Sequence, residues 1–482
     1  MSTEFSSVSP IDGQVLWQGQ ATSPREIESV MCRASAATRD WRATAADGRI
    51  ELVRQYGRQL EAGRDEITAL ISREVGKLDW DAAAEVGAAI AKIELSIQAF
   101  QSRRFEQVVD GGPAGGSAVQ RHIRYQPLGV TLVLGPFNFP LHLPGGQIIP
   151  ALLAGNTVVF KPSDQATAVG QWMTAAWRRA GLSEGVLQMI AGGVDTAVAA
   201  IDSPHVAGVF LTGSRGAGRA IHRQLAGRPE VLLALELGGN NPIVVMGDVP
   251  EHAVATIVSF SSFISAGQRC TCARRAIIVD SDSSQSQIDA LIKLTKNLRV
   301  GMPGDDPSPQ VGPIISAAAA TNLNRTYEQL LQLGCEPLIR FQLDSRSPNL
   351  VRPAVVNASK LTQDKLRQVG RMEWFGPLLV VQRVASFEDA IESAANTPYG
   401  LAASLLGGSR EMFDRFVGDI GAGVVNWNGP TTGAAGALPF GGLGDSGNHQ
   451  PAGFFAIDFC SDPVASLERS EPSSVDPWEI AH

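Results

Sequence analysis

The chain has 482 residues, of which 44% are hydrophobic and 18% are charged. This length predicts two or three domains, and the composition is that of a folded globular protein with large apolar cores, not of a disordered chain. The formal net charge of −8 excludes the basic surface typical of nucleic-acid-binding proteins. It also means that an anionic ligand has to be attracted by local groups, because the overall field repels it.

The N-terminus and the cysteines predict a cytoplasmic protein. The first ten residues, MSTEFSSVSP, contain neither the basic nor the apolar region of a signal peptide, and proline and glycine interrupt the apolar stretch 143–160 before it reaches membrane-spanning length. Five cysteines are scattered along the chain: Cys32, Cys270, Cys272, Cys335 and Cys460. This pattern predicts no disulfide framework and a reducing compartment.

In chain order, residues 25–100 are rich in Ala and Glu and predict helices, and the breaker cluster 110–116 (DGGPAGG) predicts a loop or hairpin turn. Short apolar runs then alternate with helical patterns such as 167–180, which Gly181 closes. The runs are 130–134, 157–160, 186–190 and 206–211. The alternation predicts a parallel sheet with crossover helices, and ligands bind beyond the carboxyl ends of such strands. Three segments fall there: 135–140, 161–164 and 213–218.

A second α/β unit is predicted from residue 231 onwards. Strand-like runs and helical patterns alternate again, and the loop 303–309 (PGDDPSP) is predicted at the surface. The strands are expected at 231–237, 243–246 and 276–279, and the helices at 250–266 and 284–298.

Residues 213–218 (GSRGAG) form a glycine-rich turn between a predicted strand and the predicted helix 215–226. This placement suits a contact between backbone N–H groups and a phosphate. The spacing does not fit the GxGxxG fingerprint, so a plain tight turn is an equally good interpretation of the residues alone.

Two residues have the chemistry of a catalytic pair. Cys270 follows Gln268 and Arg269, and a neighbouring cation favours the thiolate form of a cysteine. Glu236 lies in an otherwise apolar strand (LLALELGG), where desolvation would raise its pKa towards the range of a general base. A buried structural thiol and a surface acid are the alternatives. Cys270 and Cys272 lack further ligands at zinc spacing, so no metal site is predicted.

Seven segments, in this order, resemble the motifs of the aldehyde dehydrogenase superfamily. They are 136–140 (PFNFP), 160–163 (FKPS), 210–214 (FLTGS), 235–239 (LELGG), 267–270 (GQRC), 373–377 (EWFGP) and 439–442 (PFGG). The resemblance implies an α/β fold with a parallel-sheet cofactor domain, an α/β catalytic domain and a small β oligomerisation element. It also implies a homodimer or homotetramer, and a chain that lacks most of the family's N-terminal strands. The implied parts are 1–105 and 123–235 for NAD binding, 236–440 for catalysis, and 106–122 with 441–482 for the oligomerisation element and C-terminal tail.

The same resemblance assigns catalytic and cofactor roles. Cys270 is the nucleophile that forms a thioester, the Asn138 amide stabilises the oxyanion together with the Cys270 N–H, and Glu236 activates the hydrolytic water. NAD is the hydride acceptor, and Asp164, where the family usually has Glu, would repel the 2′-phosphate of NADP. The implied cofactor residues are Lys161, Ser163, Asp164, Gly213, Ser214, Arg215, Gly216, Ala217, Gly218, Glu373 and Phe375.

Later segments resemble the branch of this superfamily that oxidises the N-succinylated 5-semialdehyde of glutamate in arginine catabolism. They are 269–275 (RCTCARR), 426–434 (NWNGPTTGA), 446–449 (SGNH) and 466–468 (SLE). Such a dianion needs donors for two carboxylates, and 431–434 forms either an anion-binding nest or an ordinary glycine-rich turn. The expected substrate residues are Arg269, Thr271, Thr432, Gly433, Ala434 and His449. A dehydrogenase of glutamate 5-semialdehyde or another semialdehyde is the alternative. A thiol hydrolase that acts on esters without a cofactor is the alternative from a different class.

Overall fold

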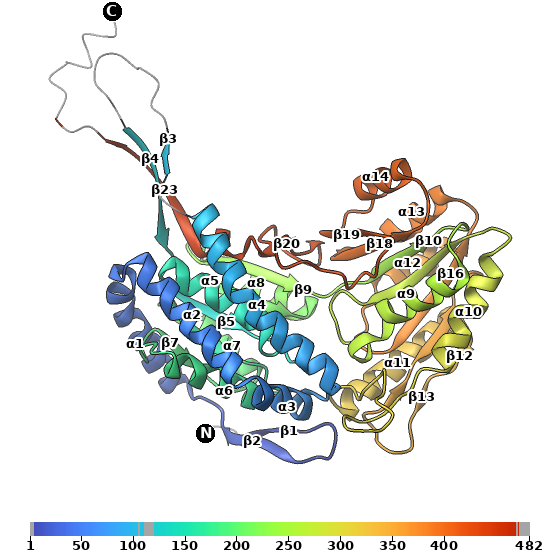
Figure 1. Ribbon diagram of the computed structural model, residues 1–482, viewed down its shortest axis with the longest axis horizontal. Helices are drawn as coiled ribbons and strands as arrows, with labels where there is room; N and C mark the ends of the chain where they lie inside the picture. The colour runs from blue at the N-terminus through green and yellow to red at the C-terminus, as the bar shows by residue number, and fades with distance from the viewer. Residues whose placement is uncertain (1–3, 105–106, 110–119, 469–470, 472–482) are drawn as a thin grey trace, which may run out of the picture.

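A computed structural model describes residues 4–104, 107–109, 120–468 and 471. Two α/β units lie side by side, and a narrow three-stranded sheet projects from the first of them (Figure 1). The loop or hairpin turn predicted at 110–116 lies outside the described residues.

The N-terminal region begins with a β-hairpin and continues as four helices. The hairpin pairs β1 (Glu4–Val8) with β2 (Val15–Gln20) in antiparallel register. The helices are α1 (Pro24–Ala43), α2 (Ala46–Ala62), α3 (Arg64–Val75) and α4 (Asp79–Arg103). The first helix starts at a capping box in which Ser23 and Glu26 satisfy each other's backbone N–H groups.

The first unit contains a five-stranded, fully parallel sheet in the order β7-β6-β5-β8-β9. Its strands are β5 (Val130–Leu134), β6 (Thr157–Lys161), β7 (Leu187–Met189), β8 (Val206–Gly213) and β9 (Leu232–Leu237). Its crossover helices are α5 (His142–Ala154), α6 (Thr167–Arg179), α7 (Val194–Ile201) and α8 (Arg215–Gln224). Alternate residues of each strand face opposite layers: Val133 packs with α2 to α6, whereas Leu132 packs with α1 and α7. The predicted parallel sheet is therefore confirmed.

The second unit contains a seven-stranded sheet in the order β12-β15-β16-β11-β10-β18-β19, parallel except for the antiparallel edge pair β12–β15. Its strands are β10 (Asn241–Val245), β11 (Ala273–Val279), β12 (Glu336–Ile339), β15 (Ala354–Asn357), β16 (Leu378–Val384), β18 (Ala402–Leu406) and β19 (Val424–Trp427). Its helices are α9 (Glu251–Phe263), α10 (Ser284–Lys296), α11 (Ala317–Leu333), α12 (Gln363–Arg371), α13 (Phe387–Ala395) and α14 (Arg410–Asp419). The helix predicted at 250–266 ends at Phe263, and a short 3₁₀ turn, η1 (Ile264–Gly267), follows it.

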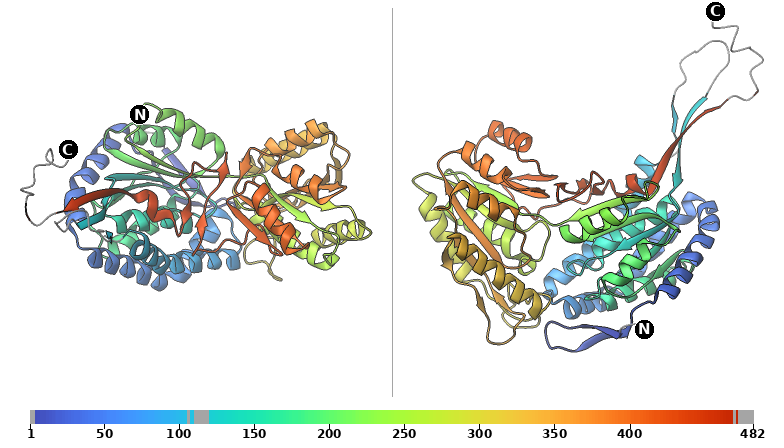
Figure 2. Two further views of the ribbon diagram at one scale, coloured as in Figure 1. Left: turned by 90° about the horizontal axis from the view of Figure 1, so that it is seen from above. Right: turned by 180° about the vertical axis from the view of Figure 1, so that it is seen from behind.

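The projecting sheet consists of β3 (Gln107–Val109), β4 (Gln120–Pro127) and β23 (Ser461–Glu468), and the right-hand view of Figure 2 shows it extending away from the body. All eight residues of β23 pair antiparallel with β4, so the C-terminal strand is joined to a segment more than three hundred residues earlier. Among the described residues, no helix combines the length and the apolar character needed to cross a membrane.

Candidate active site

A cavity of about 1030 Å³ opens where the carboxyl ends of the first sheet meet the second unit. Its walls come from the segments after β5 and β6, the ends of β8 and β9, one face of α4 and the turn before β11. This volume is large for a single small ligand and leaves room for a nucleotide together with a substrate.

Cys270 lies in this cavity, half-buried, on a turn with unusual backbone geometry. Ser265, Ala266 and Gly267 adopt left-handed φ values of 53°, 54° and 72°, which only glycine accepts without strain. A Cβ on Gly267 would lie 2.3 Å from the Gly376 carbonyl oxygen. Asn241 holds the far side of the turn, because its Nδ2 donates to the carbonyl oxygens of Cys270 and Cys272 at 2.7 and 2.8 Å. The position of the thiol is therefore set by contacts on both sides.

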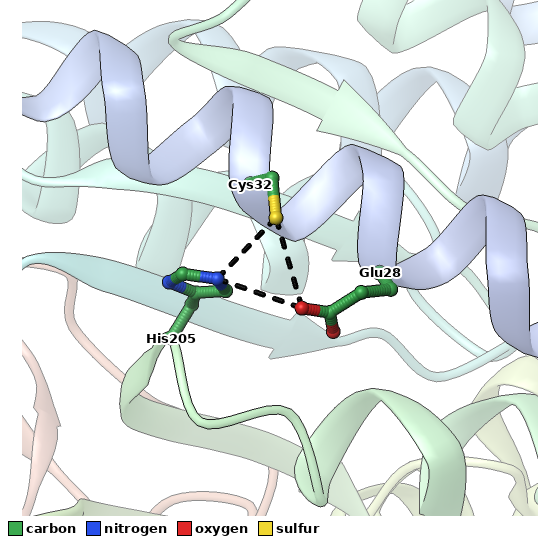
Figure 3. Close-up of side chains that lie close together, drawn as sticks. All are labelled: Glu28, Cys32 and His205. Atoms are coloured by element: carbon green, nitrogen blue, oxygen red, sulfur yellow. Dashed lines mark hydrogen bonds and ion pairs between the residues drawn. The ribbon is translucent and has the colours of Figure 1, made fainter.

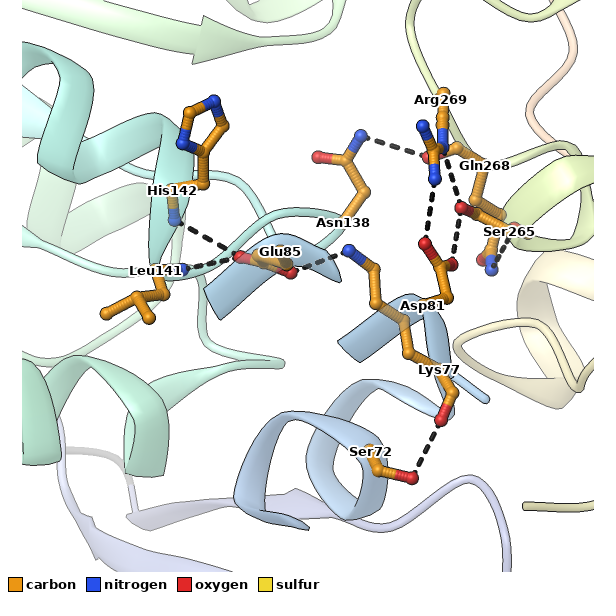
Figure 4. A network of polar contacts seen from close by, with 10 residues as sticks. All are labelled: Ser72, Lys77, Asp81, Glu85, Asn138, Leu141, His142, Ser265, Gln268 and Arg269. Carbon is orange, nitrogen blue, oxygen red and sulfur yellow. Dashed lines mark hydrogen bonds and ion pairs between the residues drawn. The ribbon is translucent and has the colours of Figure 1, made fainter. Parts of the chain in front are cut away.

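The expectation that Arg269 favours the Cys270 thiolate is wrong. The Arg269 guanidinium donates to Asp81 Oδ1 at 2.7 Å and stacks over the Phe139 ring, so its charge is already compensated (Figure 4). Burial, followed by the neighbouring Glu236 carboxyl, raises the pKa of the Cys270 thiol to about 12, and only Arg274 among the nearby cations opposes this shift. The thiol is consequently protonated at neutral pH in the ligand-free protein.

Glu236 is the penultimate residue of strand β9; it faces the same cavity and is 6% exposed. Its Oε1 accepts a hydrogen bond from the Ala452 N–H at 3.2 Å, and its Oε2 is buried without a partner. Burial raises the pKa of this carboxyl well above its ordinary value, as its place in an apolar strand predicted. The free oxygen is positioned to take a proton from a group in the cavity.

Asn138 lies between β5 and α5, and its side chain is buried at the cavity wall. Its Nδ2 donates to the Gln268 carbonyl oxygen at 3.0 Å, two residues before Cys270 (Figure 4). The second hydrogen of this amide remains available to a ligand oxygen.

The expected cofactor residues fall into two groups. Lys161, Ser163, Asp164, Gly213, Ser214 and Ala217 line the cavity. Arg215, Gly216 and Gly218 are absent from its lining: Arg215 forms an ion pair with Asp445, and Gly218 packs against Leu237 of β9. Lys161 Nζ donates to the carbonyl oxygens of Pro162 and Gly192, both at 2.8 Å, and burial lowers its pKa to about 8.

Glu373 and Phe375 line the cavity beside the end of β9. The Glu373 carboxylate accepts a hydrogen bond from the Gly239 backbone and lies across Gly238, where a Cβ would be only 1.5 Å from its Oε1. Gly238 therefore makes room for this carboxylate. Phe375 packs edge-on against Phe137, with the ring centroids 5.9 Å apart.

Of the expected substrate residues, Arg269, Thr271, Thr432 and Ala434 line the cavity. Gly433 and His449 are not part of its lining, and His449 is exposed with a φ of 67°. The Thr432 hydroxyl is buried without a hydrogen-bond partner, which leaves it available to a ligand.

The sequence analysis missed the wall formed by helix α4. Asp81, Glu85, Ala88 and Lys92 of this helix line the cavity at spacings of three and four, which place them on one face. The available signal was the set of charged residues that recur at helical spacing in an Ala-rich segment. Nothing in the local sequence indicates that this face meets Cys270, because Asp81 and Arg269 are 188 residues apart.

A group of possible metal ligands lies elsewhere. Glu28 and Cys32 of α1 meet His205, with Cys32 Sγ 3.4 Å from His205 Nε2 and His205 Nε2 3.5 Å from Glu28 Oε1 (Figure 3). None of the three lines the cavity. The mutual contacts, with a further hydrogen bond from Ser203 to Glu28, account for the cluster without an ion.

Comparison with known proteins gives the class to which this fold and site belong. The model of the aldehyde dehydrogenase family matches residues 1–464, and the chain belongs to that family. It is an oxidoreductase that acts on aldehydes. Over 472 residues it is 42% identical to the N-succinylglutamate 5-semialdehyde dehydrogenase of Novosphingobium aromaticivorans, covering 97% of each chain. Over 477 residues it is 40% identical to the protein of the same name from Serratia proteamaculans, covering 98% of this chain and 95% of that one.

A solved structure is similar over almost the whole length. The NADP-dependent glyceraldehyde-3-phosphate dehydrogenase of Bacillus halodurans, complexed with NADP, superimposes with a TM-score of 0.89 and is 26% identical. The match covers 97% of this chain and 96% of that one. The predicted α/β fold class is therefore confirmed.

Proposed function

We propose that this enzyme oxidises N-succinyl-L-glutamate 5-semialdehyde to N-succinyl-L-glutamate, with NAD as hydride acceptor, in the succinyltransferase route of arginine catabolism. Two relatives at 42% and 40% identity with that name support the substrate. The observation that carries the chemistry is that Cys270, Glu236 and Asn138 line one cavity.

The cavity suits a nicotinamide dinucleotide. Lys161 keeps one N–H beyond its two carbonyl contacts, and the Glu373 carboxylate lies in a cradle that a Cβ at Gly238 would fill. These two groups would hold the two riboses, with Phe375 against the nicotinamide half. The exposed Asp164 carboxylate would repel a 2′-phosphate, which favours NAD over NADP. When bound, the nicotinamide ring supplies the hydride acceptor.

The residues of the chain carry the rest of the reaction. Cys270 Sγ, after losing its proton, adds to the aldehyde carbon and forms a thiohemiacetal whose oxygen bears the negative charge. The Asn138 amide and the Cys270 backbone N–H donate to that oxygen, and losing one such donor typically costs about 3–4 kcal/mol of transition-state stabilisation. Removal of the aldehyde hydrogen as hydride leaves a thioester on Cys270. Glu236 then takes a proton from water, which attacks the thioester carbon and releases the acid and the thiol.

The remaining proposals concern assembly. We assign cofactor binding to 1–105 and 123–235, catalysis to 236–440, and oligomerisation to 106–122 with 441–482, in a cytoplasmic homodimer or homotetramer. Among the described residues, the outer edges of β3 and β23 pair with no further strand; this supports the last assignment, because exposed strand edges are templates for pairing with another chain.

Initial rates of NADH formation with a panel of aldehydes test the proposal. The N-succinylated semialdehyde should have a higher kcat/KM than glutamate 5-semialdehyde, and both should exceed acetaldehyde. NAD should be preferred to NADP, and Asp164→Ser should reduce that preference. Equal kcat/KM for acetaldehyde and the dianion would refute the substrate. Ester hydrolysis without NADH formation from any aldehyde would favour the thiol hydrolase.

A further inference from the structure

Helix α4 presents a stripe of five residues to the cavity: Asp81, Ala84, Glu85, Ala88 and Lys92. At a rise of about 1.5 Å per residue, the stripe extends about 16 Å along the wall. It is therefore long enough to follow an extended substrate from the turn that carries Cys270 towards a more distant part of the cavity.

The two acids of the stripe are fully engaged by the protein. Asp81 pairs with Arg269 at 2.7 Å and accepts a hydrogen bond from Ser265. Glu85 Oε2 pairs with Lys77 Nζ at 2.6 Å, and its Oε1 accepts the backbone N–H groups of Leu141 and His142 (Figure 4). Each charge in this network has a partner of opposite sign.

Lys92 differs from these residues. Lys92 is buried, with 5% of its surface exposed, and its Nζ donates to the Gly453 carbonyl oxygen at 2.5 Å. It forms no ion pair with any carboxylate in the described part of the chain. A buried ammonium without a counter-ion is costly, and burial lowers the pKa of Lys92 to about 8. Two of its three N–H groups remain for a ligand.

Two neutral donors accompany the ammonium at the cavity wall. His142 Nδ1 is buried without a hydrogen-bond partner, and burial together with Lys92 and Lys77 lowers the pKa of His142 to about 4, so the imidazole is neutral at pH 7. The Thr432 hydroxyl is also buried without a partner. A cation in the same cavity as an unused hydroxyl and an unused imidazole nitrogen is the chemistry that binds a carboxylate.

We propose that Lys92 binds a carboxylate of the substrate and selects anionic aldehydes over neutral ones. The proposal rests on the proposed function, in which the substrate is a dianionic semialdehyde. It explains how an enzyme with a net charge of −8 retains such a substrate: the counter-ion is a single buried ammonium inside the cavity, not a surface field.

The test compares Lys92→Met with the parent enzyme on the N-succinylated semialdehyde and on propanal. Loss of a hydrogen bond between charged groups should lower kcat/KM for the dianion by about 10- to 100-fold, mainly through KM, and leave propanal within about threefold. Lys92→Arg, which keeps the charge, should recover part of the loss. Calorimetry should show the product N-succinyl-L-glutamate binding more weakly to Lys92→Met by a similar factor.

A second variant leaves Lys92 in place. Ala88 lies one turn earlier at the cavity wall, and Ala88→Glu should provide an internal carboxylate for the ammonium, since Glu at i pairs favourably with Lys at i+4. It should reproduce the selective loss, whereas Ala88→Gln should not. This comparison tests the proposed role of Lys92 even if Lys92→Met does not fold.

The outcomes separate the two proposals. A parent enzyme that does not prefer the dianion refutes the proposed function itself. A parent that prefers it, together with variants that keep the full preference, refutes the role of Lys92 alone. Equal losses for dianion and propanal in Lys92→Met would show that Lys92 only holds the Gly453 segment, and would overturn the inference.

Discussion

At the scale of single residues, the two reactive groups of the site share one property. Burial raises the pKa of both groups, to about 12 for the Cys270 thiol and well above its ordinary value for the Glu236 carboxyl. The proposed mechanism uses both in the deprotonated form, and activity should therefore increase as the pH is raised above neutrality, because the thiolate fraction of Cys270 increases. The local sequence predicted that a cation beside Cys270 favours its thiolate. Ionisation of this thiol depends instead on how far bound ligands oppose its desolvation.

The rate of alkylation of Cys270 measures the ionisation of its thiol directly. With a pKa of about 12, the thiolate fraction of the ligand-free protein should grow about tenfold per pH unit between pH 7 and pH 10, and the rate of reaction with iodoacetamide should grow with it. Peptide mass spectrometry resolves Cys270 from the exposed Cys32, which serves as an internal control. A rate that levels off below pH 9 would show a much more acidic thiol.

Replacing Glu236 by Gln removes the proposed base and keeps the side chain's size. The variant should release about one NADH per active site in a burst and then turn over at least about 100-fold more slowly than the parent, because the thioester accumulates. Stopped-flow absorbance measures the burst, and intact-mass analysis should detect the acyl group on Cys270. Cys270→Ala is the matched control and should give no burst. An unchanged steady-state rate would exclude Glu236 from the hydrolytic step.

At the scale of elements, the turn between α9 and β11 determines where Cys270, the proposed nucleophile, lies. Three left-handed residues reverse the chain immediately before Gln268, and hydrogen bonds from Ser265 to Asp81 and from Asn241 to Cys270 hold the turn from two different elements. Left-handed Ser and Ala each cost about 1–2 kcal/mol, so the surrounding contacts must offset this strain. Helix α4 thus holds the turn that carries Cys270 as well as forming the cavity wall.

Gly267→Ala tests the importance of this turn. The new Cβ would lie 2.3 Å from the Gly376 carbonyl oxygen, on a residue with a φ of 72°, so the backbone has to move and Cys270 moves with it. A displacement of about 1 Å can cost about 100-fold in rate, and we expect kcat to fall by at least that factor. Gly87→Ala in α4, where a Cβ meets nothing within 4 Å, is the control and should keep full activity. Retention of kcat in Gly267→Ala would show that the turn tolerates repacking.

At the scale of the whole molecule, the charge distribution affects the approach of an anionic substrate, and the projecting sheet offers a surface for assembly. The net charge of −8 repels an anionic substrate at long range, whereas the cations that face the cavity are buried or paired. The projecting sheet adds a surface that the two α/β units do not need for their own cores (Figure 2).

The dependence of kcat/KM on ionic strength reports the balance between the long-range repulsion by the net charge and the short-range attraction by cations in the cavity. Salt screens the long-range repulsion more than it screens a buried contact. Raising NaCl from 10 to 150 mM should therefore leave kcat/KM for the dianionic semialdehyde unchanged or increase it by up to about twofold. Propanal, which is neutral, controls for general effects of salt. A decrease of more than threefold for the dianion alone would indicate an attractive surface field.

The positions of the main strands and the proposed reactive residues could be predicted from the sequence by itself. Runs such as 130–134 and 157–160 are apolar on both faces because helices cover both sides of a parallel sheet, and Gly181 closes α6 with a φ of 96° as predicted. The motifs around Cys270, Glu236 and Lys161 contain their own glycines and polar neighbours, so their places at strand ends and turns could be predicted locally.

Tertiary structure decided the rest, because it depends on contacts between distant segments. Arg269 is a cation in the sequence, but Asp81 from α4 neutralises it, and the pKa of Cys270 rises when it was expected to fall. His449 was expected at the substrate and lies exposed, whereas Lys92, in an unremarkable Ala-rich helix, faces the cavity. The effect of a charged group on a neighbouring pKa depends on how deeply the group is buried and on which group it pairs with. Neither is defined until the chain has folded.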